Sequence, residues 1–184
     1  MLRLCSTSIV RKQILKAHKI PFIQCDNGFD EEQLPLDKPK NFVYQAALGK
    51  HKSALMLYGL ESPLLIVDSV IDCGGILQRK AKNEAEAREF LEAQNGKTFK
   101  ILTCAILHCS KFFYVDLSQT CFELFPFVPQ DLESYLKSGA WKNKAGAVMV
   151  EGFHQNYIKC QIGTTSNAMG LNIESLLPFL RNVI

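Results

Sequence analysis

The chain has 184 residues, of which 47% are apolar and 21% are charged, and its formal net charge is +3. This length suits one domain, or one domain with a small second lobe, and the apolar content excludes a largely disordered chain. The small net charge does not favour a nucleic-acid or membrane-surface binder, because such proteins usually carry a concentrated basic face.

The seven cysteines are scattered and form no Cys-x-x-Cys pair, so neither a zinc ribbon nor a thioredoxin-like site is indicated. We interpret them as buried free thiols in a reducing cytosol. The first residues lack the apolar core of a signal peptide, and no apolar run reaches the roughly 18 residues of a membrane span. We therefore expect a cytoplasmic protein with neither membrane nor nucleic-acid partners.

The first part of the chain alternates short apolar runs with helical patterns. A strand at 2–5 is followed by hydroxyl residues that can cap a helix at 9–19. A second strand is expected at 21–24, and the polar stretch 26–40, with Asn-Gly and two prolines, predicts a loop. A helix follows from about residue 42 to 58, where a glycine supplies the stop signal.

In the middle of the chain, the continuous apolar run 64–67 predicts a buried central strand that ends at Asp68. Residues 70–78, around a Gly-Gly pair, predict a hairpin, and 84–93 a helix closed by Asn-Gly. Three further segments are rich in strand-forming residues: 97–108, 112–117 and 120–127.

The last part begins with Pro129, which is expected in the first turn of a helix that runs to Leu136. Short strands at 147–150 and 157–162 and a final helix at 173–181 complete the pattern. Because strands and helices interleave, we expect an α/β fold with a mixed sheet. No linker divides the chain, so a single domain over 1–184 is expected.

A candidate anion site lies at the first strand–turn–helix. The turn Ser6-Thr7-Ser8 would present free backbone N–H groups and the positive end of a helix dipole. Arg11 follows in the first turn and can grip phosphate oxygens with two N–H groups. An ordinary capped helix with solvated basic residues would have the same pattern.

Asp68 is a candidate catalytic or metal-binding residue. A carboxylate at the carboxyl end of a buried strand lies where α/β folds place ligands, and it can hold Mg²⁺ or activate water. The alternative is a turn residue that caps the next segment. Glu31, Lys50 and Lys80 have no distinguishing context alone, and the sequence leaves open whether Lys50 or its neighbour Lys52 would face a site.

Taken in order, several segments resemble the Maf family of nucleoside triphosphate pyrophosphatases. The matching segments, with the family pattern in brackets, are 5–12 (A-S-x-S-P-R-R), 30–31 (an acidic pair), 47–50 (A-x-x-K-A), 67–70 (G-A-D-T-V), Lys80 (K-P), 95–97 with Thr103 (S-G-K and T), 144–147 (K-A-G-A) and 169–171 (V-G-L-P). The main departures are Val10, which replaces an arginine, Ser69, which replaces a threonine, and Ala81, which replaces a proline.

The resemblance implies a Maf- and ITPase-like mixed sheet bent around a nucleotide-binding cleft. It implies hydrolysis of a nucleoside triphosphate to monophosphate and pyrophosphate with Mg²⁺ or Mn²⁺ as cofactor. The residues it assigns are Asp68 and Glu31 for catalysis and metal binding, and Ser6, Arg11, Lys50 and Lys80 for phosphate binding. Family analogy also allows a homodimer, and it leaves an alternative function: a nucleotide-binding regulator of cell division and septum formation with little turnover.

Three further positions are expected to select the base: Val10, Ser69 and Glu151. The family branch that acts on dTTP and UTP typically has Arg, Thr and Gln there, and the branch that acts on 7-methyl-GTP has Trp, Gln and Glu. An ionised carboxylate only accepts hydrogen bonds, and guanine offers adjacent N1–H and N2–H donors. We therefore expect a guanine-type or modified base to be preferred over dTTP and UTP. The alternative is that Glu151 points away and merely ends a strand.

Overall fold

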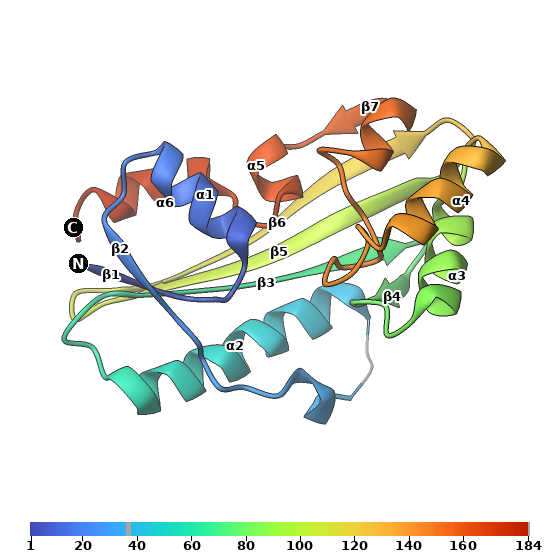
Figure 1. Cartoon of the computed structure of the whole chain (residues 1–184). Coiled ribbons are helices and arrows are strands. Elements are labelled where there is room, and N and C mark those ends of the chain that lie inside the picture. Colours follow the sequence, from blue (N-terminus) through green and yellow to red (C-terminus); the bar gives the residue numbers. More distant parts are fainter. Residues whose placement is uncertain (36–37, 184) are drawn as a thin grey trace.

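The computed structural model describes residues 1–35 and 38–183 (Figure 1). The strands of this part are β1 (Leu2–Cys5), β2 (Phe22–Cys25), β3 (Leu64–Cys73), β4 (Ile76–Gln78), β5 (Thr98–His108), β6 (Phe113–Leu124) and β7 (Ile158–Ile162). The α-helices are α1 (Ile9–Ala17), α2 (Pro39–Tyr58), α3 (Glu84–Gln94), α4 (Pro129–Ser138), α5 (Thr165–Ala168) and α6 (Ile173–Leu180). Two short 3₁₀ helices are η1 (Glu31–Gln33) and η2 (Phe153–Tyr157).

The strands form one seven-stranded sheet in the order β2-β1-β3-β5-β6-β7, with β4 paired to β3. Strand β1 is parallel to both β2 and β3, and the other pairings are antiparallel. The predicted α/β fold with a mixed sheet is therefore confirmed. The longest ladders join β3, β5 and β6, which form the long central part of the sheet in Figure 1.

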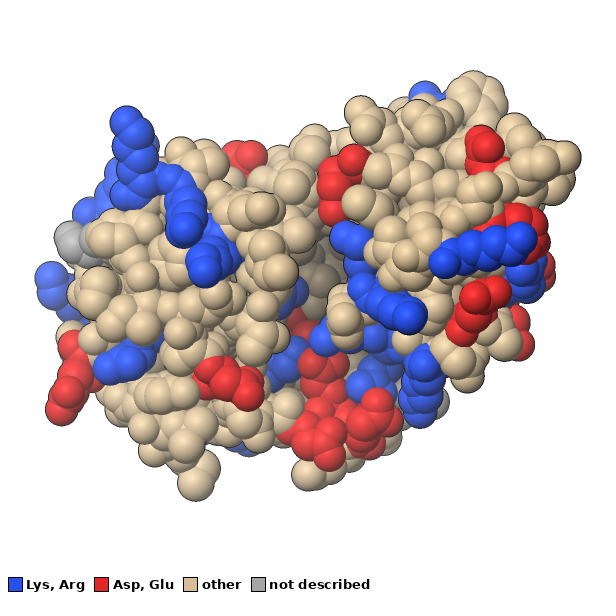
Figure 2. Space-filling model, in the orientation of Figure 1, with Lys and Arg blue, Asp and Glu red and all other residues tan. Residues whose placement is uncertain are grey.

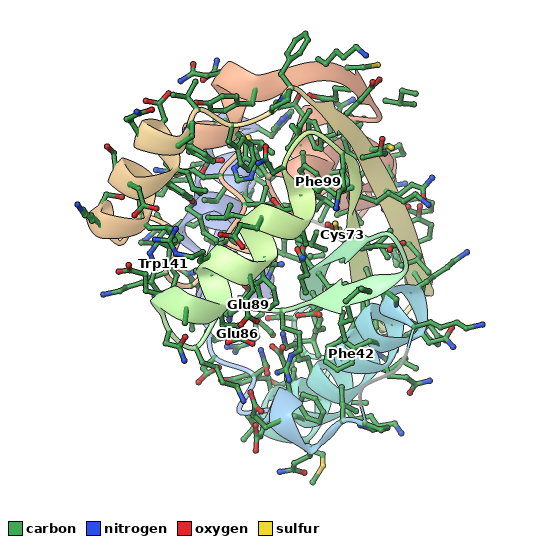
Figure 3. The ribbon with its side chains drawn as sticks, turned by 90° about the vertical axis from the view of Figure 1, so that its right-hand side faces the viewer. Phe42, Cys73, Glu86, Glu89, Phe99 and Trp141 are labelled. Atoms are coloured by element: carbon green, nitrogen blue, oxygen red, sulfur yellow. The ribbon has the colours of Figure 1, made fainter. Side chains whose placement is uncertain are left out.

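Helices cover the two faces of the sheet in three groups. Helix α2 lies along one face, and its Phe42, Val43 and alanine side chains pack on the apolar residues of β3 and β5. On the opposite face, α1 and α6 cover the end where the two termini lie (Figure 1). Helices α3 and α4 cover the other end, where Phe99 and Trp141 join a third apolar core (Figure 3).

Local sequence signals fix where the helices begin and end. The Ser8 hydroxyl accepts a hydrogen bond from the Arg11 N–H at the start of α1, and the Asn83 side chain caps α3 in the same way. Pro129 is in the first turn of α4, and Gly139 ends that helix with a positive φ of 67°. None of the described helices is long and apolar enough to cross a membrane. All seven cysteines are free thiols, as expected, but the expectation that they are buried is wrong for Cys160, which is exposed, and Cys25 and Cys121 are only partly buried.

Some predicted strand boundaries are wrong, and one of these corrections places Asp68 in the middle of a strand, not at its end. Strand β3 does not end at Asp68 but runs on to Cys73, because β5 pairs with it as far as Asp72 and Lys100. The segments predicted at 112–117 and 120–127 belong to a single strand, β6, that pairs with β5 from Phe113 to Glu123 and ends at Leu124. The predicted strand at 147–150 is wrong, because Gly146 and Ala147 both have φ of +56° and turn the chain.

Smaller differences concern the loops. The predicted loop 26–40 contains η1 and the first residues of α2, and its positions 36 and 37 lie outside the described residues. Helix α5 has no counterpart among the predicted elements. The predicted hairpin at 70–78 is confirmed, since β3 and β4 are antiparallel around Gly74 and Gly75.

Candidate active site

A cleft of about 890 Å³ opens between the two ends of the molecule, and Figure 2 shows it as a hollow with Lys, Arg, Asp and Glu side chains along its lower wall. Its walls come from the β1–α1 turn, the middle of β3, the stretch after β4, the loop before η2 and the turn after α5. All the residues that the sequence singled out line it: Ser6, Val10, Arg11, Glu31, Lys50, Asp68, Ser69, Lys80 and Glu151.

At the base of the cleft, Lys50 joins two carboxylates from distant parts of the chain. Its Nζ donates a hydrogen bond of 2.5 Å to Asp68 Oδ1 and forms an ion pair with Glu31 Oε1. Lys50 is 8% exposed and Asp68 is 5% exposed, so both charges are largely removed from water. Lys52 is exposed, and Lys50 is therefore the lysine of α2 that faces the cleft.

The second oxygen of Asp68 has no partner among the residues that the structure describes. Oδ2 is buried, and no described residue donates a hydrogen bond to it. A buried carboxylate oxygen without a partner is costly, so its retention needs an explanation such as a bound cation or water. Asp68 thus presents one lone oxygen to the cleft while Lys50 holds the other.

The two carboxylates have pKa values shifted in opposite directions. Burial raises the pKa of Asp68 and the nearby Glu31 charge adds to this, while Lys50 and Arg11 only partly offset it. For Glu31, burial alone would raise the pKa, but Lys50, together with Lys80 and Arg79, holds it below its ordinary value. Asp68 is therefore the better proton acceptor near neutral pH. Glu31, with its lowered pKa, stays ionised to lower pH than an ordinary glutamate does.

Arg11 is held by hydrogen bonds to three separate segments. Nε donates to the Gly170 carbonyl at 2.8 Å, Nη1 to Ser6 Oγ at 3.0 Å and to the Val67 carbonyl at 2.8 Å, and Nη2 to Ser69 Oγ at 3.0 Å. Four of the five N–H donors of a guanidinium group are thereby used. Burial lowers the pKa of Arg11, whereas the nearby Asp68 and Glu31 raise it.

Ser6 shares in this arrangement, because its buried hydroxyl oxygen also accepts the Ser8 N–H at 3.3 Å. Arg11 and Ser6 thus tie the β1–α1 turn to the middle of β3 and to the turn after α5. Within the part of the chain that the structure describes, one N–H of Arg11 Nη2 remains for a ligand, so a phosphate-binding role for Arg11 must act through that donor and through its charge.

The three candidate base-selecting positions lie on the cleft walls, and Glu151 is engaged there. Glu151 Oε1 accepts a hydrogen bond from Lys144 Nζ at 3.0 Å. Glu151 lies in a turn before η2, so the alternative that it ends a strand is wrong. Ser69 Oγ is 3.0 Å from Thr103 Oγ1 and accepts a hydrogen bond from Arg11 Nη2. Val10, in the first turn of α1, is partly buried and packs against the apolar core beneath that helix.

A buried polar network holds the loop that carries Lys144 and Glu151. Gln94 Nε2 donates to Gln78 Oε1 and to the Gly146 carbonyl, both at 2.8 Å. His154 Nδ1 accepts the Met149 N–H at 3.1 Å, so Nε2 carries the ring proton and donates to Gln94 Oε1 at 3.0 Å. The loop is therefore fixed at both ends to α3 and β4.

Sequence reasoning missed Arg79, which lies beside Lys80 at the cleft wall. Its Nη2 is 3.3 Å from Glu32 Oε1 and 3.7 Å from Glu31 Oε2. The only sequence feature that pointed to this position was the hairpin before it, because the strand that leaves the hairpin must return toward the site. A basic residue at that position has no pattern of its own to distinguish it from a solvated one.

The donor set fits a metal ion that is shared with a ligand. The described residues contain no group of three or more His, Cys, Asp or Glu side chains that could hold an ion unaided. Mg²⁺ is usually held by one or two carboxylates and completes its shell with water and phosphate oxygens. Asp68, with its unpartnered Oδ2, and the adjacent Glu31 meet that requirement.

The fold and the cleft define an α/β protein whose paired carboxylates and surrounding cations suit a phosphorylated, metal-bound ligand. The model of the Maf family, described as Maf-like protein, matches residues 1–183. Nucleoside triphosphate pyrophosphatases of Nitratiruptor sp. and Helicobacter pylori are 43% and 42% identical, over 100% and 96% of this chain and 100% and 93% of theirs. The relative of that name in Campylobacter jejuni is 36% identical over 98% of this chain and 100% of its own.

The chain therefore belongs to the Maf family. Among solved structures, the Staphylococcus aureus Ham1 protein has a similar fold, with a TM-score of 0.55, 12% sequence identity and coverage of 98% of both chains. This likeness supports the predicted arrangement of a mixed sheet around a cleft.

Proposed function

We propose that the protein hydrolyses nucleoside triphosphates to the monophosphate and pyrophosphate. The observation that carries the proposal is the Lys50–Asp68 pair, with Asp68 Oδ2 buried and unpartnered at the base of a large cleft. The names of the relatives at 36–43% identity and the family match support the same activity.

In this mechanism Asp68 takes the proton from the attacking water. Lys50 holds Oδ1 and so aims Oδ2 at the cleft, and the raised pKa brings the carboxyl nearer to the operating pH of a general base. A Mg²⁺ or Mn²⁺ ion held by Asp68 and Glu31 would supply charge neutralisation to the phosphate oxygens. Positioning and charge stabilisation do most of the catalytic work in such hydrolyses.

The cationic groups offset the negative charge of the triphosphate, which would otherwise repel the water. Lys80 lies close enough to Glu31 to lower its pKa, and its exposed side chain lines the cleft. Arg11 adds its charge and one N–H donor, and the turn residues Ser6, Thr7 and Ser8 at the start of α1 line the same cleft.

Base choice follows from the ion pair at the cleft rim. Glu151 can accept from the N1–H and N2–H groups of guanine, while Lys144, 3.0 Å away, can donate to the neighbouring O6. A uracil or thymine edge offers one N–H between two carbonyls, so one carbonyl would face the carboxylate. We therefore infer a preference for guanine-type or modified purine triphosphates over dTTP and UTP.

One experiment tests both the proposed reaction and the proposed base preference. Purified protein is incubated with Mg²⁺ and with dTTP, UTP, GTP or 7-methyl-GTP in turn, and the products are identified. Monophosphate and pyrophosphate are expected, with the highest kcat/KM for a guanine base. Release of orthophosphate alone, or binding without turnover as expected of a cell-division regulator, would contradict the proposed reaction. A clear pyrimidine preference would contradict only the base assignment.

A further inference from the structure

Arg79 directly follows β4 and is fixed by its backbone at the wall of the cleft. Its carbonyl accepts the Gly146 N–H at 2.8 Å, and the next residue, Lys80, forms an isolated antiparallel bridge with Ala145. The guanidinium carbon lies 5.1 Å from the ring centre of Phe42 on α2, the helix labelled at that residue in Figure 3. This cation–π contact uses the flat face of the guanidinium group and leaves its N–H edges for other partners.

Those N–H edges have loose partners among the described residues. The contacts of Nη2 to Glu32 and Glu31, at 3.3 and 3.7 Å, are longer than the roughly 2.7–2.9 Å of a charge-assisted hydrogen bond. Nε is buried and has no hydrogen-bond partner within residues 1–35 and 38–183. Glu32 is 62% exposed, so water screens this pair and weakens it. Arg79 thus contrasts with Arg11, whose donors are nearly all used.

Glu31 links Arg79 to Lys50 of the catalytic centre. One carboxylate oxygen of Glu31 pairs with Lys50, and the other faces Arg79. An anion that attracts Arg79 would therefore also release Glu31 from one of its cations. A phosphate group presents several charged oxygens in a geometry that matches the guanidinium fork, so it competes well with single carboxylate contacts.

We propose that Arg79 binds the terminal phosphates of the substrate, exchanging its contacts with Glu31 and Glu32 for the part of the triphosphate that leaves as pyrophosphate. The proposal rests on the proposed function for the identity of the substrate. In this proposal Arg79 binds the leaving group, and the exposed carboxylate of Glu32 competes with that group for the Arg79 guanidinium.

Arg79→Gln is the direct test, and Arg88→Gln is its control. Arg88 forms an ion pair of 2.5 Å with Glu133 between α3 and α4 and does not line the cleft. Steady-state hydrolysis should show a KM about tenfold higher for Arg79→Gln, with kcat changed much less, and both constants unchanged for Arg88→Gln. The inhibition constant of inorganic pyrophosphate should rise in parallel, while that of the monophosphate product stays constant.

The role of Glu32 gives a prediction of opposite sign. Glu32→Gln should lower the inhibition constant of pyrophosphate about twofold in the wild-type background and have no effect when combined with Arg79→Gln. Equal effects in both backgrounds would mean that Glu32 acts by general repulsion, which contradicts the exchange.

Direct binding of inorganic pyrophosphate, measured by calorimetry in the presence of Mg²⁺, separates this inference from the proposed function. If the wild type hydrolyses no triphosphate but binds pyrophosphate about tenfold more tightly than Arg79→Gln does, the reaction is wrong and the Arg79 site stands. If the wild type hydrolyses triphosphates and Arg79→Gln has KM and pyrophosphate affinity within twofold of it, Arg79 is not a substrate ligand. A loss of stability with unchanged KM would overturn the inference equally.

Discussion

Protonation of His154 should destabilise the fold as the pH falls, because this histidine is buried neutral beneath the loop that carries Lys144 and Glu151. Burial lowers its pKa from the ordinary 6.5 to about 3. The hydrogen bond from the Met149 N–H occupies Nδ1, so a proton arriving there would break it and leave a charge in an apolar core.

The sign and size follow from proton linkage. The unfolded chain binds a proton at His154 below about pH 6.5 and the folded chain does not until about pH 3. The stability contribution is therefore present above the unfolded pKa and is lost as the pH falls toward the folded pKa. Between about pH 7.5 and about pH 4.5 the loss amounts to about 2–3 kcal/mol, at about 1.4 kcal/mol for each pH unit below 6.5.

Urea unfolding of the wild type and His154→Gln at these two pH values measures the effect. Glutamine does not titrate and keeps an N–H donor, so the variant is less stable at neutral pH but loses about 2–3 kcal/mol less on acidification. Comparison within the pair cancels the contributions of other groups. If the two proteins lost stability equally, within about 0.5 kcal/mol, the assignment of His154 as a buried neutral histidine would be wrong.

Three further predictions concern the cleft. Arg11→Lys should unfold at lower temperature, by about 2–4 kcal/mol in stability, because a lysine cannot reach Ser6, Val67 and Gly170 together; an unchanged thermal midpoint would contradict this. Gly49→Ala should raise KM and cost about 1–3 kcal/mol in urea unfolding, since the added Cβ would lie 2.2 Å from the Phe29 ring before Glu31; unaltered kinetics would refute it. Chelation of divalent ions should stop pyrophosphate release and Mg²⁺ or Mn²⁺ should restore it, and turnover that persists in excess chelator would exclude the metal role.

The sequence predicted the fold class well because apolar periodicity and turn residues are local signals. It failed where a neighbouring strand decides the outcome. Asp68 is a poor strand residue, and an apolar run that reaches an aspartate normally ends there. Strand β3 continues because β5 supplies backbone partners on both sides of Asp68 and Lys50 neutralises its charge.

The segment 147–150 illustrates the opposite error. Its short run of apolar residues is typical of a buried strand, and Ala147, Val148 and Val150 are indeed buried. Their burial comes from a turn with positive φ at Gly146 and Ala147 that is held by Gln94, a residue too distant in the chain for periodicity to detect.

Local pattern singled out Ser6, Arg11 and Asp68, whereas only the resemblance to a family singled out Glu31, Lys50 and Lys80. The spacing of Glu31, Lys50 and Asp68 says nothing of their contact, which depends on α2 packing along β3. Arg79 has no matching position in the family motifs quoted for the sequence, and its approach to Glu31 and Glu32 depends on the course of β4.

The central claim is that Asp68, oriented by Lys50, activates the water that attacks the triphosphate. The most direct measurement is the rate of pyrophosphate release by Asp68→Asn at saturating substrate and Mg²⁺, beside Asp72→Asn, which alters the same strand outside the cleft. Removal of a general base should lower kcat by about 100-fold or more, while Asp72→Asn stays near the wild-type rate. Folded Asp68→Asn protein that releases pyrophosphate within about twofold of the wild type, with the same metal dependence, would contradict the claim.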